Sequence, residues 1–323
     1  MKAKLNKEKT KLSTRLYILL IIMFVTTPIG FKFIETLTNK KHEVEVTAAI
    51  AFSYIESSNI KAIKSIPRQR LANIEDEHGR SLLMLASYIG EYKIVKYLLK
   101  DNTIINKTDQ KGNTAIIYAT KNDNEKTMRL LIKKGANLNQ ANSIGINPLI
   151  ITAVDNNMLM LQLMIANGAN VDNFDINMHT PLMYAIYSGN IQIAKLLLTK
   201  YNASVNIISK QGKGALEIAI EQRESSIARM IIEKTNNLAR KDINSKNALE
   251  LAIDANLPSV VDAILAKDIT LLDSIKTNKA VTSLNQQNKI IYLIIKEYRK
   301  KYNILPKMQP NTQKLYNAVI NNK

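Results

Sequence analysis

Apolar, polar and small residues recur at a step of about 33 positions between Glu77 and Asp242. The first half of a copy reads Gly79-Arg-Ser-Leu-Leu-Met-Leu-Ala86, and the next copy reads Gly112-Asn-Thr-Ala-Ile-Ile-Tyr-Ala119. The second half carries apolar residues at helical spacing, as in Ile94-Val-Lys-Tyr-Leu-Leu99. Most of these runs are followed by Gly or Asn, the residues that best tolerate the left-handed backbone at a helix end. A fixed period of this size predicts stacked modules, each a turn, a short helix, a longer helix and a loop.

Small residues and helix-start signals occupy constant places in this period. An alanine closes the first half of each copy and predicts close approach of neighbouring helices. Pairs such as Thr180-Pro181 predict the start of the first helix. The Thr hydroxyl can accept a hydrogen bond from a backbone amide that lacks a partner in the helix, and Pro fits the first helical position. The alanines are Ala86, Ala119, Ala153, Ala185, Ala219 and Ala252.

The copies resemble the ankyrin repeat, whose signature is Gly-x-Thr-Pro-Leu-His-x-Ala-Ala, a Leu-Leu-Leu helix and Gly-Ala-Asp-Val-Asn. Thr180-Pro181-Leu182 with Leu196-Leu197-Leu198 is the closest copy, and Gly168-Ala169-Asn170-Val171-Asp172 resembles the loop. The resemblance implies an all-α, helix-turn-helix solenoid. The signature histidine has a structural role in the family, so its loss predicts divergent units. Its place is taken by Met84, Ile117, Ile150, Met183, Glu217 and Glu250.

The repeats are predicted to span residues 44–275. Five units carry the pattern clearly, and the fourth of them has one extra residue around Tyr201–Ser204. The two outer units are degenerate, as expected for modules with one face toward water. The predicted units are 44–76, 77–109, 110–142, 143–175, 176–209, 210–242 and 243–275.

The charge is concentrated at the two ends of the chain. The 323 residues carry a net charge of +18, yet residues 44–275 hold 26 basic and 23 acidic side chains. Residues 1–43 hold 9 basic and 3 acidic side chains, and residues 276–323 hold 10 and 1. A solenoid that binds nucleic acid is expected to carry a basic stripe along its length. The nearly neutral repeats therefore predict no nucleic-acid partner.

The N-terminal end has the form of a membrane-targeting segment. A basic leader, residues 1–15, precedes a hydrophobic segment, residues 16–34, and a linker, residues 35–43. The pattern predicts an uncleaved transmembrane anchor or a cleaved secretory signal, and either places the repeats outside the cytoplasm. A buried core helix is the third interpretation. The leader cations are Lys2, Lys4, Lys7, Lys9, Lys11 and Arg15.

The basic C-terminal region, residues 276–323, contains one predicted amphipathic helix. From Asn285 to Tyr302, isoleucines and tyrosines share one side and lysines take the remainder. The helix is interpreted as a cap on the last repeat, because an open solenoid end needs cover. Binding to an anionic membrane or to a partner is the alternative.

Catalytic signatures are absent from the sequence. There is no cysteine, so disulfides, thiolate metal sites and cysteine catalysis are excluded. His42, His78 and His179 are too far apart in the repeat register to converge, and there is no P-loop, dinucleotide fingerprint or His-Glu-x-x-His. We therefore predict that the protein is not an enzyme and has no cofactor, metal or small-molecule substrate.

The resemblance implies that turn tips and first helices line a concave protein-binding face. We expect a non-enzymatic interaction scaffold, membrane-anchored or exported, with an unknown protein partner. The alternative is a peripheral membrane or lipid-associated adaptor that uses the basic termini. Tyr88, Ile144, Ile146 and Tyr187 stand out as apolar residues at nominally exposed positions. The candidate residues are Tyr88, Ile89, Lys121, Asn122, Val154, Asp155, Tyr187, Ser188, Glu221 and Gln222 on helices, and Lys111, Asn113, Ile144, Ile146, Asn177 and His179 at turn tips.

Overall fold

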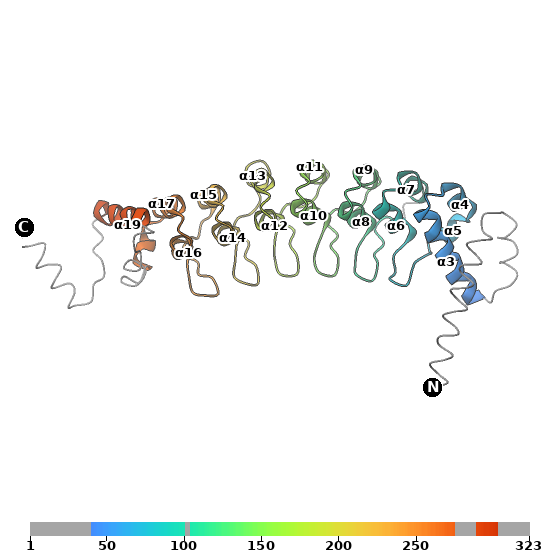
Figure 1. The fold of residues 1–323 in the computed structure, drawn as a ribbon, viewed down its shortest axis with the longest axis horizontal. Helices are drawn as coiled ribbons and strands as arrows, with labels where there is room; N and C mark the ends of the chain where they lie inside the picture. The colour runs from blue at the N-terminus through green and yellow to red at the C-terminus, as the bar shows by residue number, and fades with distance from the viewer. Residues whose placement is uncertain (1–39, 101–103, 275–288, 303–323) are drawn as a thin grey trace, which may run out of the picture.

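The computed structural model describes residues 40–100, 104–274 and 289–302 (Figure 1). The predicted leader and hydrophobic segment, residues 1–34, lie outside the described residues. None of the described helices is long and apolar enough to span a membrane.

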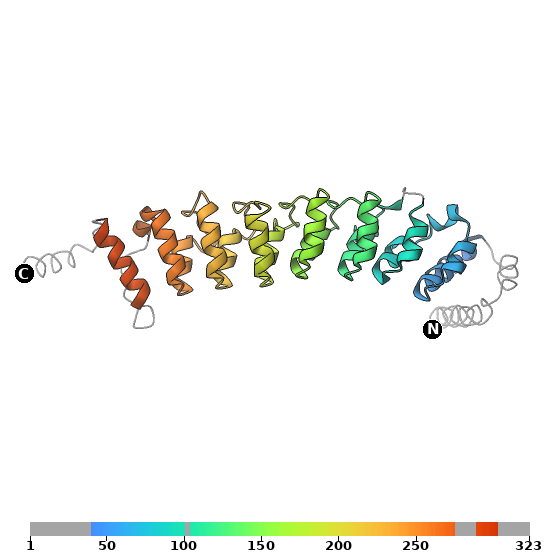
Figure 2. The ribbon, with the colours of Figure 1, turned by 90° about the horizontal axis from the view of Figure 1, so that it is seen from above.

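Seven consecutive helix pairs form the described part of the repeats. Figure 1 shows the first helices in one row, the second helices in another, and long loops on the far side of the first row. Figure 2 shows the second helices side by side along the molecule. The pairs are α3 (Lys40–Glu56) with α4 (Ile60–Ser65), α6 (Leu82–Ile89) with α7 (Tyr92–Leu98), α8 (Ala115–Lys121) with α9 (Glu125–Lys133), α10 (Pro148–Val154) with α11 (Met158–Ala166), α12 (Pro181–Tyr187) with α13 (Ile191–Thr199), α14 (Ala215–Glu221) with α15 (Ser225–Lys234), and α16 (Ala248–Asp254) with α17 (Pro258–Lys267).

Local sequence signals set the ends of the helices. The side-chain oxygens of Ser81, Thr114 and Thr180 each accept a hydrogen bond from the backbone amide three residues later. These hydrogen bonds cap the N-termini of the helices. Pro181 occupies the first helical position. The chain then reverses between the two helices of a pair through one residue with a positive φ. These residues are Ser58, Gly90, Asp123, Asn156, Gly189, Arg223 and Asn256.

The hydrophobic core runs as one cluster through all seven pairs. Each first helix contacts the first helix of the next pair, so every unit completes the core of its neighbour. The prediction that small residues permit this approach is confirmed, because the alanine at the end of each copy is fully buried. These are Ala86, Ala119, Ala153, Ala185, Ala219 and Ala252.

The residues that replace the signature histidine have structural roles. Met84, Ile117 and Met183 are buried in the core. Glu217 and Glu250 instead accept the backbone amides of Gly214 and Asn247, at 2.8 and 2.9 Å, and so cap α14 and α16.

The two ends of the described array differ from the regular pairs. Helix α3 begins at Lys40, inside the segment 35–43 interpreted as a linker. A short helix α5 (Arg68–Leu71) follows α4, and a 3-10 helix η2 (Ile269–Ser274) follows α17. Helix α19 (Lys289–Lys301) lies against α17, with Ile291 and Ile295 buried.

Candidate binding face

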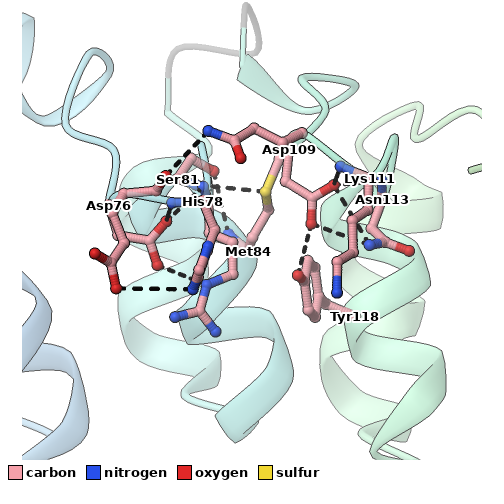
Figure 3. A network of polar contacts seen from close by, with 11 residues as sticks. Asp76, His78, Ser81, Met84, Asp109, Lys111, Asn113 and Tyr118 are labelled. Atoms are coloured by element: carbon pink, nitrogen blue, oxygen red, sulfur yellow. Dashed lines mark hydrogen bonds and ion pairs between the residues drawn. The ribbon is translucent and has the colours of Figure 1, made fainter. Parts of the chain in front are cut away.

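The long loops between helix pairs are hairpins held by similar side-chain hydrogen bonds, and we call these hydrogen bonds the polar frame. In five of the six described hairpins a side-chain oxygen at the start accepts hydrogen bonds from the amides two and four residues on, and in the sixth the Ser209 hydroxyl accepts one from the Lys213 amide at 3.2 Å. For Asp109 these are the amides of Lys111 and Asn113, both at 2.8 Å, and Figure 3 shows Asp76 and Asp109 in this role. Asp76, Asn142, Asp175 and Asp242 make the same pair of contacts. The sequence therefore fixes each hairpin through one residue.

Neighbouring hairpins are joined through their backbones. The amide of Ser143 donates to the carbonyl of Lys111 at 2.9 Å, and the amide of Ile176 donates to that of Ile144 at 3.2 Å. Gly145 lies so close to the next hairpin that a Cβ there would be 2.5 Å from the Cα of Asp175. We call the surface formed by these hairpins and the adjoining ends of the first helices the hairpin face. It is the face that the resemblance predicts to be concave.

Two aspartates of the frame also bind side chains of the following first helix. The hydroxyl of Tyr118 donates to Asp109 Oδ2 at 2.7 Å, and that of Tyr184 donates to Asp175 Oδ2 at 2.9 Å. His179 Nδ1 lies 3.3 Å from the same Asp175 oxygen. These contacts tie the hairpins of units 110–142 and 176–209 to the helices α8 and α12.

Ionisation of the two aspartates follows from these contacts. Burial raises the pKa of Asp109 and of Asp175, but their hydrogen bonds outweigh burial and lower both below the ordinary value. Burial and the contact with Asp175 raise the pKa of Tyr184 to about 12. The carboxylates are therefore charged and the tyrosines neutral near pH 7. Both groups form hydrogen bonds to each other within the protein.

Side chains from the hairpin and from the end of the first helix meet on this face, eight residues apart. In the last two units they form ion pairs, between Lys213 and Glu221 at 2.7 Å and between Lys246 and Asp254 at 2.5 Å. In unit 110–142 the Lys121 ammonium donates to Asn113 Oδ1 at 3.2 Å. In the two middle units the same positions hold Ile146 with Val154 and His179 with Tyr187.

Most of the sequence-predicted site residues are exposed on the surface. Tyr187 is 63% exposed and Ile144 is 56% exposed. Ile146, Asn177 and His179 are half-buried. The remaining exposed candidates are Tyr88, Ile89, Lys111, Lys121, Asn122, Val154, Asp155, Ser188, Glu221 and Gln222.

Asn113 was predicted at a turn tip, and this placement is wrong. The residue is only 3% exposed, because its side chain turns inward. Its Nδ2 donates to Asp109 Oδ2 at 3.0 Å, and its Oδ1 accepts from Asn142 Nδ2 at 3.0 Å. Asn113 thus belongs to the frame that links two hairpins and not to the exposed surface.

Three exposed apolar residues of the hairpins were missed by the sequence analysis, and Ile243, next to the buried Asp242, is the most exposed of them at 69%. Phe174 and Ile176 flank the buried Asp175 and are 50% and 51% exposed. Ile176 is joined to Ile144 through the backbone contact between hairpins. An apolar residue on each side of a hairpin aspartate is the signal that could have identified Phe174 and Ile176.

A pocket of about 400 Å³ lies between units 176–209 and 210–242 on the hairpin face. Tyr184 and Tyr187 come from α12, and Ile218 comes from α14. His179 and Lys213 enter from the two hairpins. The pocket thus combines aromatic and aliphatic walls with polar side chains at its rim.

His78 and His179 lie where the sequence predicts, on hairpins three units apart, whereas His42, predicted in the linker, lies in helix α3. His78 is exposed and lies 3.8 Å from Glu77, and His179 faces Asp175. Within the described ranges, no group of three or more His, Cys, Asp and Glu side chains could hold a metal ion.

The comparisons with known proteins agree with the repeat pattern. The family model described as "Ankyrin repeats (3 copies)" matches residues 51–142 and 137–209. No curated protein matches the chain.

Proposed function

The chain belongs to the ankyrin-repeat family, and we propose that it is a non-enzymatic scaffold that binds another protein through its hairpin face. Ankyrin repeats are interaction modules, which supports a protein partner in general. The proposal for the hairpin face rests on one observation. Exposed apolar side chains gather there in units 143–209, namely Ile144, Val154, Ile176 and Tyr187.

These side chains are suited to be anchors because the backbone beneath them is fixed. Ile144 and Ile176 sit on hairpins joined to each other, and Tyr187 ends the helix whose Tyr184 binds Asp175. A rigid apolar side chain loses little entropy on binding and gains free energy from burial. A partner would therefore bury these residues and place one of its own apolar side chains in the pocket beside Tyr187.

The experiment uses the full chain fused to a proximity-labelling enzyme in its native cell. The variant Ile144→Ser with Tyr187→Ser removes two anchors from the hairpin face. Its matched control, Leu159→Ser with Tyr292→Ser, removes one aliphatic residue and one tyrosine that are exposed on α11 and α19. We expect one labelled partner to fall about tenfold with the face variant and to persist with the control.

Thermal unfolding of the purified variants distinguishes binding from folding. Both double variants should unfold within a few degrees of the wild type, because the residues are exposed. Loss of stability in the face variant alone would show that these residues pack within the protein. An unchanged set of labelled partners would refute the hairpin face as the binding site.

We also propose that residues 16–34 anchor the chain in a membrane, with the repeats outside the cytoplasm. The support is the sequence pattern alone, a cationic leader followed by an uncharged apolar run. The test is a reporter enzyme that is active only outside the cytoplasm, fused to the C-terminus of the full chain. An inactive reporter would refute this topology, and release of the active fusion from membranes would indicate a cleaved signal.

Helix α19 is proposed to cover the end of the repeats. Its buried face packs on α17 through Ile291 and Ile295, and the Tyr298 hydroxyl donates to Asp262 Oδ1 at 3.1 Å. These contacts support a cap over the alternative of a lipid-binding helix at this end. Yet Ile290 and Leu293 remain exposed near Lys296, so α19 serves as the comparison helix in the lipid experiment below.

A further inference from the structure

The outer side of the second helices is strongly basic at one end of the array. Helices α7 and α9 carry exposed cations at equivalent positions, 33 residues apart. The next helix, α11, has no charge at the corresponding places, which hold Leu159, Gln162 and Ala166. The paired cations are Lys93 with Lys126, Lys96 with Arg129 and, two residues beyond the end of α7, Lys100 with Lys133.

Helix α4 extends this surface. It adds the exposed Lys61 and Lys64, and α4, α7 and α9 lie next to one another in Figure 2. Within these three helices the only acidic residue is Glu125, which pairs with Arg129 at 2.8 Å. We call the outer sides of α4, α7 and α9, with the adjoining Arg68 and Lys100, the basic patch.

Cations converge around one tyrosine at the centre of the basic patch. The Tyr97 ring centroid lies 5.1 Å from the Arg68 guanidinium, 5.7 Å from Lys100 Nζ and 5.9 Å from Lys64 Nζ. Tyr97 itself is half-buried and packs against the core, which fixes its position. Cations held this close repel one another, so the approach of an anionic surface is favourable.

We propose that the basic patch docks on an anionic lipid bilayer. The patch is presented by a row of neighbouring helices, and the row faces away from the hairpins (Figure 1). Lysines dominate it, and Tyr92 is exposed among them, a combination typical of surfaces that rest on lipid headgroups. The hairpin face stays free for a protein while the patch contacts lipid.

The position of the patch in the chain favours lipid over a soluble polyanion. Helix α3 begins at Lys40, so five residues separate it from the hydrophobic segment 16–34 proposed to enter the membrane. The first helix pairs would therefore be held beside the bilayer. A surface adapted to a long nucleic acid would continue along the array, whereas the run of cations stops at α11.

The first test uses single cysteines, because the chain has none of its own. Ser65→Cys places a polarity-sensitive dye in the basic patch, and Ser226→Cys places it on α15, where the serine is also exposed. Full-length protein is mixed with vesicles of phosphatidylcholine, with or without phosphatidylglycerol. We expect the Ser65 dye to shift its emission to the blue only with phosphatidylglycerol, and the Ser226 dye not to respond.

The second test measures the charge dependence. Lys93→Gln, Lys96→Gln and Lys126→Gln together should weaken vesicle binding by up to about a hundredfold, since each lysine near an anionic surface contributes about fivefold. The control removes the same charge from α19 through Lys296→Gln, Lys300→Gln and Lys301→Gln. We expect a much smaller loss with the control.

Three results would overturn the proposal. The first is a Ser65 dye that does not respond to phosphatidylglycerol, and the second is an equal response of both dyes. The third is an equal loss of binding in the two charge variants, or a larger loss in the α19 variant. If polyglutamate or DNA shifts the Ser65 dye and the vesicles do not, the patch binds a soluble polyanion instead.

Discussion

The hairpin face of the middle units and that of the last two units have the same backbone but different chemistry. Units 143–175 and 176–209 present Ile146 with Val154 and His179 with Tyr187. Units 210–242 and 243–275 place ion pairs at those positions, led by Lys213 with Glu221. A partly exposed ion pair is satisfied inside the protein, whereas an exposed apolar residue gains free energy only when something covers it. The proposed binding surface therefore lies over the middle units, while Ile243 is the exposed apolar residue on the hairpin of the last unit.

The two regions also differ in how closely their hairpins pack. A Cβ on Gly145, in a middle unit, would meet backbone atoms of the next hairpin at 2.5 Å. A Cβ on Gly212, in the equivalent place of unit 210–242, would meet only the Ile243 side chain at 3.1 Å. The hairpin of unit 143–175 thus packs more tightly on the next hairpin than the hairpin of unit 210–242 does.

Gly145→Ala should produce the largest effect of the changes considered. The new methyl group would collide with the backbone of Asp175 and Ile176, and φ at this position is +80°. We expect a loss of about 3 kcal/mol or more in the free energy of unfolding. Urea unfolding followed by circular dichroism measures it.

Two controls separate the collision from backbone strain. Gly168→Ala has a similar φ of +92° with nothing within 4 Å, so it should cost only about 1 kcal/mol. Gly212→Ala should fall between the two, because the Ile243 side chain can move. Equal costs for Gly145→Ala and Gly212→Ala would contradict the difference in hairpin packing.

Arg240→Ala tests how much the ion pair with the buried Glu217 stabilises the last two units. Glu217 is buried, accepts the Gly214 amide and pairs with Arg240 Nη2 at 2.5 Å, while Arg240 Nη1 donates to the Gly212 carbonyl. Removing the guanidinium leaves a buried carboxylate without its cation. We expect about 2 kcal/mol of destabilisation, below the range for fully buried pairs because Arg240 is partly exposed.

The double variant Glu217→Met with Arg240→Ala is the control for this result. Met occupies the same position in unit 176–209, as Met183, where it packs in the core. The double variant should recover much of the lost stability. If it is as unstable as Arg240→Ala alone, the cost does not come from an unpaired charge.

The sequence predicted the helices and their buried positions better than the roles of surface residues. A period set by packing repeats the same residue types, so helix positions, caps and buried alanines could be read directly. Surface roles depend on where a side chain turns, and the inward rotation of Asn113 toward Asp109 leaves no trace in the repeat pattern. The basic patch was hidden for another reason. Summing charge over residues 44–275 averages it with the acidic residues of other surfaces.

Asp175→Asn tests whether the middle hairpins depend on an ionised carboxylate. The folded pKa of Asp175 lies below the ordinary value, so the charged form stabilises the fold above the unfolded pKa of about 3.9. That contribution is lost as the pH falls through the folded pKa. At pH 7 the variant should lose about 1 to 2 kcal/mol, since it weakens hydrogen bonds to a charged group.

The pH dependence supplies the control for Asp175→Asn. The difference from the wild type should shrink as the pH falls below about 4, because the unfolded carboxyl takes up its proton there and the folded one does so only at lower pH. Asp155→Asn, in the same unit, should show no loss at pH 7, because burial and Asp123 raise the pKa of Asp155. A constant difference between pH 7 and pH 3 would mean that shape, not charge, is what Asp175 supplies.

Lys246→Ala should produce the smallest effect and completes the comparison. Its partner Asp254 is exposed, and both side chains remain in contact with water, so the pair contributes at most about 0.5 kcal/mol to folding. Urea unfolding in low and high salt measures the change, and salt should remove what little there is. A loss above 1 kcal/mol, or a loss that salt leaves unchanged, would mean that the ion pairs of the last units hold the fold together. The contrast would then be between two structural solutions rather than between a binding region and a non-binding one.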